Sequence, residues 1–525
     1  MSDSSRTEAT LPTLAASLSA DSGQSVLSLT ILFHPDPERI GDYWEGELKS
    51  RRRSLQLGRH QPEFTGPRGS PRGLDDDHVS RQSLQLSFGR DGLQLRRHTN
   101  ACRCRLNGHV LGGQDLGGES PGGDAIFLEP AQLAEGCVVQ LAHTVVLWLH
   151  TGPPRGANPT GVAQSLLGRS AGMCALRREI ARLGATDFDV LVLGETGAGK
   201  EEVARALHRA SPRSGRALVP VNMAAIPETL APSLLFGSAR GAFTGAGAAS
   251  RGFFRQAEGG TLFMDEIGAV PPAIQPQLLR ALQQREIQVV GGDLVAVDVR
   301  VIAATDSPLD AGDCNFSSAL RHRLGSLEIR VPSLRSHRED LGLLLWHFLR
   351  TEAPGLGSES LLPGVQGDPL AVARWAELFQ RFALYSWPGN IRELANAARQ
   401  LLVASERQLV MPPGLESRMR ADTGEVDAPA ETLPERPRVD EAMFRRAHID
   451  SEYEAAATAR SLSISRQAVY RLIEDSGEFR LASDVPEKEL ETALAEAEGD
   501  VRQAALTLRV SYQGLRARMR QRGSR

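Results

Sequence analysis

The sequence predicts a multidomain protein with an N-terminal all-β module, a central α/β domain and a C-terminal all-α region. Its 525 residues are too many for one ordinary hydrophobic core. Two stretches rich in proline, glycine and polar residues, 151–160 and 411–439, are typical of linkers. The hydrophobic pattern changes at both, from short alternating runs to buried runs between helical stretches, and then to helical spacing alone. We therefore predict domains over residues 24–150, 161–410 and 440–525.

The composition is that of a soluble globular protein with a local basic segment. Hydrophobic residues make up 41% of the chain and charged residues 24%, and the net charge is −4. From Asp500 to Arg525 the chain carries seven arginines and one acid, which favours this segment for nucleic-acid contact. Five scattered cysteines argue against a disulfide framework, and neither a signal peptide nor a membrane span is recognisable. We expect a cytoplasmic protein without a membrane partner.

The N-terminal module is predicted to be all-β because it contains short alternating runs, Val26–Phe33, Ser83–Phe88 and Val138–Leu149. Four residue pairs make it resemble a forkhead-associated (FHA) domain, a β-sandwich that reads phosphothreonine peptides. These pairs are Gly58-Arg59, Ser80-Arg81, Thr99-Asn100 and Asn107-Gly108.

The resemblance implies a bound phosphothreonine, in another protein or in this chain itself, held by cations and polar donors on adjacent loops. The implied phosphopeptide contacts are Arg59, Ser80, Arg81, Thr99 and Asn100. The module departs from the family at Ser83, where a histidine is usual. The alternatives are an FHA-like sandwich that has lost phosphopeptide affinity, or another β-sandwich.

The central domain begins with the elements of a triphosphate site. An apolar strand, Asp189–Leu193, leads into a G-x-x-x-x-G-K loop, and a helix is expected over Glu201–Ala210. Glycines let backbone N–H groups surround the phosphates, the helix N-terminus favours the anion, and Lys200 neutralises the terminal phosphates. Glu201 stands where a hydroxyl residue is usual. The candidate nucleotide-binding residues of this segment are Gly194, Thr196, Gly197, Ala198, Gly199, Lys200 and Glu201.

A second apolar strand, Gly260–Met264, ends in two adjacent carboxylates. Asp265 can hold Mg²⁺, and Glu266 can orient or deprotonate the attacking water. A solvated acidic pair at a strand end is the alternative, but it leaves unexplained why the pair shares a domain with a phosphate loop. The two motifs together predict hydrolysis of ATP with Mg²⁺.

Residues 162–402 resemble the sigma-54-dependent activators of the AAA+ class. The hexapeptide Gly241-Ala242-Phe243-Thr244-Gly245-Ala246 is the most specific feature, because in this family it forms the loop that contacts sigma-54. The resemblance implies a P-loop ATPase with a helical lid that works as a homo-oligomeric ring, commonly a hexamer. Small residues around one aromatic ring and one hydroxyl suit a flexible finger whose contact forms and breaks in each nucleotide cycle.

The same resemblance assigns further site residues. Asn222 matches the switch residue beside the catalytic glutamate, and Arg392, in Ser386-Trp-Pro-Gly-Asn-Ile-Arg, matches the sensor that reports on nucleotide from the lid. Arg323 matches an arginine that completes the site of a neighbouring subunit. Three positions depart from the family: Asp306 replaces an asparagine, Ser317 replaces another arginine and Leu234 replaces an acid. An added negative charge and a lost cation lead us to expect an active but slow ATPase.

The C-terminal segment 487–521 is predicted to hold three helices, with the last over Tyr512–Arg520. It resembles the Fis-type helix-turn-helix that ends most activators of this family, which implies binding to double-stranded DNA upstream of promoters. The candidate DNA contacts are Arg502, Ser511, Tyr512, Gln513, Arg516, Arg518 and Arg520. A second helical segment, Glu454–Ile473, is either another helix-turn-helix or a dimerisation element.

The sequence thus predicts an ATP-dependent activator that binds upstream DNA and remodels the closed promoter complex of sigma-54 RNA polymerase. A remodelling ATPase for another client, such as an unfoldase or chelatase subunit, is a first alternative. A DNA- and phosphopeptide-binding scaffold with weak or lost ATPase activity is a second.

Overall fold

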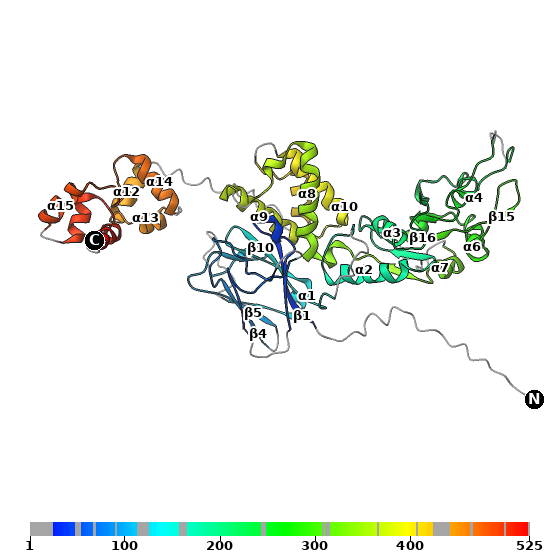
Figure 1. Cartoon of the computed structure of the whole chain (residues 1–525), viewed down its shortest axis with the longest axis horizontal. Coiled ribbons are helices and arrows are strands. Elements are labelled where there is room, and N and C mark those ends of the chain that lie inside the picture. The colour runs from blue at the N-terminus through cyan, green and yellow to red at the C-terminus, as the bar shows by residue number, and fades with distance from the viewer. Residues whose placement is uncertain are drawn as a thin grey trace, which may run out of the picture. The chain divides into compact units, whose positions relative to one another are not determined.

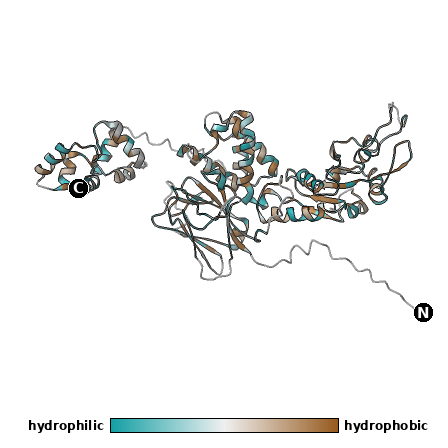
Figure 2. Cartoon of the chain, viewed as in Figure 1, coloured by the Kyte–Doolittle hydropathy of each residue, from teal (hydrophilic) through white to brown (hydrophobic). Residues whose placement is uncertain are grey.

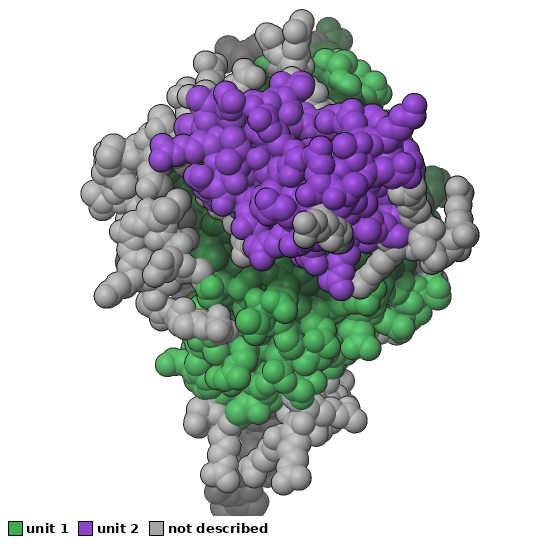
Figure 3. All heavy atoms as spheres, turned by 90° about the vertical axis from the view of Figure 1, so that its left-hand side faces the viewer, with its two compact units in different colours: residues 1–424 green, residues 425–525 purple. Residues whose placement is uncertain are grey.

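A computed structural model describes residues 25–47, 54–66, 70–89, 92–112, 125–156, 165–242, 248–306, 309, 316–364, 367–405, 408–423, 441–462, 466–497 and 500–522. The chain divides into two compact units, residues 1–424 and 425–525, which Figure 3 distinguishes by colour. No helix of the described residues is both long enough and apolar enough to cross a bilayer. The first unit contains a β-sandwich, an α/β domain and a helical lid.

The β-sandwich consists of two antiparallel sheets in the order β2-β1-β10-β9-β6-β7 and β3-β4-β5-β8 (Figure 1). One short helix, α1 (Pro130–Glu135), precedes β9. The strands are β1 (Val26–Phe33), β2 (Tyr43–Glu47), β3 (Ser54–Leu57), β4 (Leu84–Phe88), β5 (Leu93–Arg97), β6 (Cys104–Leu106), β7 (His109–Val110), β8 (Ala125–Leu128), β9 (Cys137–Leu141) and β10 (Val145–Gly152).

The alternating sequence pattern produces the sandwich core. Leu93 and Leu95 on β5 are buried, whereas their neighbour Gln94 is exposed, as the two-residue period of a strand requires. The run Val138–Leu149, one of those that predicted the β module, contains parts of two strands, β9 and β10. Ala142 has a φ of 53°, and the chain reverses there so that β9 pairs antiparallel with β10.

The α/β domain has a parallel sheet in the order β12-β13-β16-β11-β17, with an antiparallel hairpin β14-β15 beside it. The strands are β11 (Val190–Leu193), β12 (Leu218–Asn222), β13 (Thr261–Asp265), β14 (Glu286–Gln288), β15 (Leu294–Ala296), β16 (Arg300–Thr305) and β17 (Glu328–Arg330). The helices are α2 (Ala171–Gly184), α3 (Lys200–Arg209), α4 (Ala231–Phe236), α5 (Phe253–Gln256), α6 (Gln275–Gln284) and α7 (Ser318–Leu324).

Helices cover both faces of this sheet. Val190 and Val192 of β11 pack with α2 and α3, while Leu191 between them packs in the other core, with α6 and α7. Figure 2 shows the resulting concentration of hydrophobic residues along the strands. Strands buried on both faces need continuous apolar runs, which the sequence pattern contained.

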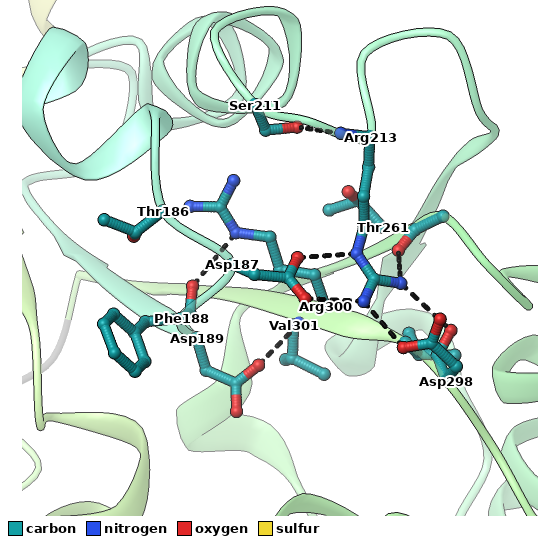
Figure 4. A network of polar contacts seen from close by, with 12 residues as sticks. Thr186, Asp187, Phe188, Asp189, Ser211, Arg213, Thr261, Asp298, Arg300 and Val301 are labelled. Atoms are coloured by element: carbon teal, nitrogen blue, oxygen red, sulfur yellow. Dashed lines mark hydrogen bonds and ion pairs between the residues drawn. The ribbon is translucent and has the colours of Figure 1, made fainter.

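An arginine network fixes the amino ends of the strands, away from the loops that follow their carboxyl ends (Figure 4). The Arg213 guanidinium donates to Asp187 at 2.6 and 2.7 Å and to Asp298 at 2.6 Å. These bonds hold the pKa of Asp187 below its usual range. The buried Arg300 donates to the Phe188 carbonyl at 3.0 Å, and the Asp189 carboxylate accepts from the backbone of Val301 at 2.8 Å.

The lid consists of α8 (Leu341–Leu356), α9 (Pro369–Leu384), α10 (Asn390–Ala404) and α11 (Pro413–Thr423). The last helix corrects the predicted linker over 411–439, because Leu415 and Met419 are buried in the core of the lid. Two apolar residues within a proline-rich, polar stretch gave too weak a periodicity to reveal a helix from sequence.

The sandwich and the lid share one hydrophobic core. Phe33 of β1 lies 5.0 Å from Phe379 of α9 between ring centroids, and Trp148 of β10 is buried in the same cluster. At Gly342 of α8 a Cβ atom would lie 2.2 Å from the Leu32 carbonyl oxygen, so only glycine permits this approach. The contact is therefore continuous packing and not a loose association.

Replacing Phe33 by alanine is expected to lower the free energy of unfolding of the sandwich–lid body by about 3 to 5 kcal/mol, because it leaves a cavity in this shared core. Differential scanning calorimetry of the full chain measures the change. Phe127→Ala is the control, since Phe127 is 49% exposed on β8 of the same sandwich. Equal melting temperatures for the two variants would contradict the described packing.

The second unit contains six helices in its described residues. They form two groups, each with its own apolar core, α12–α14 and α15–α17. The helices are α12 (Glu441–Asp450), α13 (Ala455–Ser461), α14 (Arg466–Ser476), α15 (Glu487–Glu496), α16 (Val501–Leu508) and α17 (Tyr512–Arg522). The segment Glu454–Ile473 therefore spans α13 and most of α14, and the predicted recognition helix is α17.

Candidate functional site

The predicted nucleotide residues meet at the carboxyl edge of the parallel sheet. The loop after β11 leads directly into α3, and Gly197 and Gly199 there adopt φ angles of 76° and 101°. Nothing lies within 4 Å of where a Cβ on Gly199 would be, so the loop leaves open space above the helix N-terminus. Open space, left-handed glycines and a following helix are what a bound phosphate chain requires.

Lys200 is held at the centre of this edge. It is 7% exposed, and its ammonium group donates to the Gly194 carbonyl at 2.9 Å and lies 3.9 Å from the Glu266 carboxylate. A buried cation between an acceptor and a carboxylate has a fixed position. It can therefore exchange these contacts for phosphate oxygens without rearrangement of the backbone. Glu201, by contrast, is exposed and forms an ion pair with Arg205 along α3.

Asp265 and Glu266 occupy the end of β13, and Asn222 is the register partner of Asp265 on β12. Glu266 has a φ of 53°, an uncommon backbone conformation for a residue with a side chain. The Asn222 side chain accepts from the backbone of Ala224 at 2.9 Å. The structure thus brings the candidate switch residue, the Mg²⁺ candidate and the base candidate to two adjacent strand ends.

Burial raises the pKa of Glu266, and the nearby Lys200 opposes this shift, while Asp306 and Asp265 add to it. A general base benefits from a raised pKa, because the proton-accepting carboxylate becomes more basic. Asp306, at the end of β16, also accepts a hydrogen bond from the Thr196 hydroxyl of the loop. This departure from the family therefore lies within the site, where its charge acts on the base.

Replacing Asp306 by asparagine is expected to raise the rate of ATP hydrolysis by about threefold to tenfold, since a negative charge near the phosphates is removed. The pKa of Glu266 should also fall, because a neighbouring anion no longer disfavours its ionised form. Activity should then persist to lower pH. Phosphate release measured from about pH 5 to about pH 8 checks both effects. An unchanged acidic limb would show that Asp306 does not act on the base.

The lid reaches the loop through residues of its own. The Arg392 backbone donates to the Gly197 carbonyl at 3.3 Å, and a Cβ on Gly197 would lie 2.3 Å from the Gly389 carbonyl oxygen. The Asn390 side chain donates to Glu195 and to the Thr196 carbonyl, both at 3.1 Å. Arg335 forms an ion pair with Glu195. The sequence prediction missed Glu195, Asn390 and Arg335, because only the lid docked on the sheet brings them together.

Arg323 and Ser317 lie on another part of the domain. Arg323 of α7 donates to the Asp189 carboxylate at 3.2 Å and to the Leu282 carbonyl at 2.9 Å, and its side chain is 31% exposed. Ser317 is the N-cap of α7, with its hydroxyl accepting from Leu320 at 3.4 Å. The serine that replaces an arginine therefore stabilises the start of the helix. Within this chain Arg323 does not join the nucleotide residues.

The finger hexapeptide lies partly outside the described residues, which include Gly241 and Ala242 but not Phe243 to Ala246. The residues on either side of the hexapeptide, which form the base of the finger, are described. Ser238 and Ser250 exchange backbone hydrogen bonds at 3.1 and 3.0 Å, and Ala239 donates to the Val290 carbonyl at 2.9 Å. Both ends of the insertion are thus held together beside the β14–β15 hairpin.

The phosphopeptide candidates lie in loops at one end of the four-stranded sheet. These loops follow β3, precede β4 and follow β5. Arg59 donates its backbone N–H to the Ser80 carbonyl at 2.9 Å, and the Ser80 hydroxyl accepts from Cys102 at 2.7 Å. Gly58 is required because a Cβ would lie 2.1 Å from the Arg81 carbonyl oxygen. Arg81, Thr99 and Asn100 lie in the same loops and are exposed. Arg59 itself is occupied by Asp77 and by the Val79 carbonyl.

The DNA candidates are distributed over α16 and α17. Ser511 precedes α17, and Tyr512, Gln513 and the exposed Arg516 lie on it, while Leu515 is fully buried. Arg502 is exposed but paired with Glu452 at 2.8 Å. Arg518 is turned toward the start of α15, since it donates to the Ala482 carbonyl at 2.5 Å and is 24% exposed. Its placement argues against a direct base contact. The Arg520 side chain lies outside the described residues.

Two family models match the central part of the chain. Residues 166–330 match the sigma-54 interaction domain, and residues 335–432 match an AAA+ ATPase lid domain. The second match includes α11 and agrees with the corrected lid boundary. Together the two matches cover the nucleotide candidates and the lid residues that contact them.

Two curated relatives and one solved structure are similar to this chain. The DNA-binding transcriptional regulator NtrC of Klebsiella pneumoniae is 41% identical over 287 residues, which is 54% of this chain and 58% of that protein. The chain thus spans just over half the length of NtrC. The response regulator protein PilR of Pseudomonas aeruginosa is 36% identical over 330 residues, 60% of this chain and 71% of PilR. NtrX from Brucella abortus, solved in complex with ATP, is 28% identical with a TM-score of 0.43, over 59% of this chain and 69% of that one.

Proposed function

The chain belongs to the sigma-54-dependent transcriptional regulators, and we propose that it activates sigma-54 RNA polymerase by ATP-driven remodelling of the closed promoter complex. The observation that carries this proposal is the edge of the parallel sheet where Lys200, Asp265 and Glu266 meet beside the lid. The same domain carries the finger whose base is pinned by Ser238 and Ser250. A hydrolytic site and a contact element in one domain can couple chemistry to movement.

The proposed hydrolysis uses groups fixed by the sheet. The backbone of the loop from Gly194 to Gly199 would bind the phosphates, with Lys200 neutralising their charge. Asp265 would hold Mg²⁺, which supplies charge neutralisation at the phosphates. Glu266 would take the proton of the attacking water, which its raised pKa favours. Asn222, on the neighbouring strand end, would link the state of this base to the nucleotide.

The lid contacts would report hydrolysis to the rest of the chain. Arg392 and Asn390 already bind the phosphate loop through Gly197 and Glu195, so a change in the loop moves α10. The side chain of Arg392 would add a cation to the bound phosphates. A homo-oligomeric ring, with six subunits the commonest size, would let Arg323 act at the site of a neighbouring subunit, since it lies apart from the site of its own. Release of Arg323 from Asp189 would then accompany assembly.

The remaining assignments extend the proposal at both ends. The sandwich would act as an FHA-like reader of a phosphothreonine, in a partner or in this chain, once Arg59 exchanges Asp77 for phosphate. The helices α16 and α17 would bind upstream DNA through the exposed Arg516 and the N-terminal residues of α17. Phosphothreonine and unphosphorylated forms of one peptide library, compared for binding to the full chain, test the first assignment.

One observation favours a second function, a DNA- and phosphopeptide-binding scaffold with weak or lost hydrolysis. Asp306 places a third carboxylate beside Asp265 and Glu266 at the phosphate edge. ATP turnover of the wild type compared with Asp265→Ala separates the two functions. A wild-type rate clearly above that of the variant supports the ATPase, and equal rates support the scaffold.

The proposed activation is tested with purified full-length protein, sigma-54 RNA polymerase and supercoiled promoter DNA. Open-complex formation is expected with ATP and is expected to fail with ADP or a non-hydrolysable analogue. The footprint of melted DNA measures the result. A remodelling ATPase for another client would hydrolyse ATP in this assay but leave the promoter closed, and that outcome would refute the proposal.

A further inference from the structure

The two helical groups of the C-terminal unit are copies of one another. The helices of the second group begin at Glu487, Val501 and Tyr512, and each begins 46 residues after its counterpart in the first group. Residues 441–477 and 487–523 therefore align without a gap. Identical residues at this spacing include the pairs Ala447 and Ala493, Ala459 and Ala505, Leu462 and Leu508, Ser465 and Ser511, and Gln467 and Gln513.

Equivalent positions form the two cores. Val469 of α14 and Leu515 of α17 are both fully buried, and so are Thr458 of α13 and Ala504 of α16. Phe444 of α12 and Leu490 of α15 are each 1% exposed. A matching pattern of buried positions at one fixed spacing means that the same three-helix fold is built twice. In this alignment α13 and α14 correspond to α16 and α17.

The first copy has a cluster of aromatic side chains in its core. The His448 ring contacts the rings of Phe444 and Phe479, at centroid distances of 5.2 and 4.9 Å, and its ring nitrogen contacts the Thr458 hydroxyl at 2.9 Å. Burial lowers the pKa of His448 to about 4, so the ring packs as a neutral group. Ala459, Val469 and Ile473 of α13 and α14 pack inside this copy, whereas Tyr470 and Arg471 of α14 are exposed.

The outer face of α14 has the character of a DNA-reading helix. Tyr470 is 43% exposed and Arg471 is exposed, and Tyr470 occupies the position of Arg516 in the second copy. The first turn begins with Arg466 and Gln467, and Gln467 matches Gln513. The acids of this helix, Glu474 and Asp475, fall in its last turn. A recognition helix contacts bases with its N-terminal residues, so these acids lie away from the reading end.

We propose that α13 and α14 form a second DNA-binding helix-turn-helix, so that each chain reads two segments of double-stranded DNA with α14 and α17. The inference rests on the DNA-binding part of the proposed function and adds a site to it. One exposed pair joins the two copies, Arg502 with Glu452 at 2.8 Å, and Arg509 of the second copy pairs at 3.2 Å with Glu478, which follows the first copy. Exposed pairs of this kind are weak, so DNA phosphates can displace them.

Selection from a library of random 40-bp duplexes (about four helical turns) by the full-length protein tests the inference. The wild type is expected to select a motif with two parts. Arg471→Ala and Tyr470→Ala should each remove the information in one part and weaken binding to the selected duplex roughly tenfold or more. Arg516→Ala should remove the other part. Arg445→Ala is the matched control, because Arg445 is an exposed arginine of the same copy but lies on α12.

Three other outcomes would each contradict the inference, and the selected motif and the sedimentation coefficient distinguish them. A single motif that Arg471→Ala leaves intact would show that only α17 reads DNA, and the proposed function would stand. An intact motif with a changed sedimentation coefficient for Tyr470→Ala would identify the first copy as a self-association element. Selection of no motif by the wild type would remove both the inference and the DNA-binding part of the proposed function, while ATP hydrolysis would remain a separate measurement.

Discussion

Replacing Glu266 by glutamine is expected to lower the rate of ATP hydrolysis by about 10³-fold while ATP binding is retained. A positioned general base contributes about 10² to 10⁴ in rate, and the amide cannot accept the proton of the attacking water. The substitution keeps the size of the side chain, and Lys200, which lies 3.9 Å from the carboxylate, remains held by the Gly194 carbonyl. Nucleotide affinity should therefore change little.

Phosphate release under single-turnover conditions and binding of a fluorescent ATP analogue measure the two properties. Glu258→Gln makes the same chemical change at the amino end of the sheet, where Glu258 accepts from the Asp298 backbone at 3.1 Å. This control should hydrolyse ATP at the wild-type rate. Retention of hydrolysis in Glu266→Gln would show that another group takes the proton, and the assignment of the base would be wrong.

Replacing Phe243 or Thr244 by alanine is expected to reduce promoter opening roughly 30-fold or more while hydrolysis stays within about twofold of the wild type. Loss of one hot-spot side chain from an interface typically costs about 2 kcal/mol or more, roughly a 30-fold loss of the productive complex. Neither residue belongs to the proposed nucleotide site, and the chain on both sides of the hexapeptide is held by the bridge between Ser238 and Ser250, so the catalytic residues should be unaffected. ATPase rate and DNA melting are measured on the same preparation.

The matched control for the finger is Leu230→Ala, which removes a large apolar side chain of the same domain that is 45% exposed. It should leave promoter opening unchanged. A finger variant that opens the promoter as well as the wild type would contradict the proposed coupling, whatever its ATPase rate. A variant that loses both activities would indicate that the finger also supports the nucleotide site.

The α/β domain was predictable from sequence because its signals are local. A buried strand, a glycine loop and a helix start lie next to each other in the chain, and the structure places β11 over Val190–Leu193 and α3 over Lys200–Arg209. Likewise the alternating run at Val26–Phe33 corresponds to β1. Local patterns of hydrophobicity determine such elements, so one stretch of sequence suffices to find them.

The contacts between distant segments were not predictable. Phe33 and Trp148 have the pattern of sandwich core residues, yet they pack against the lid, because a strand pattern does not say which neighbour covers a face. Arg323 was assigned a role at a neighbouring subunit, but nothing in its sequence revealed the ion pair with Asp189. The repeat in the second unit escaped notice because most of its matching positions conserve only burial, as Val469 and Leu515 do.

The packing of Phe33 on Phe379 has a thermodynamic consequence for signalling. Since α9 belongs to the lid and β1 to the sandwich, the two bodies cannot reorient separately without opening an apolar interface to water. A molecule that binds the sandwich more tightly in one lid position must change the affinity for nucleotide. Nucleotide must then change the affinity for that molecule by the same factor. A molecule bound to the sandwich can therefore be detected as a change in nucleotide affinity, and bound nucleotide as a change in the affinity for that molecule.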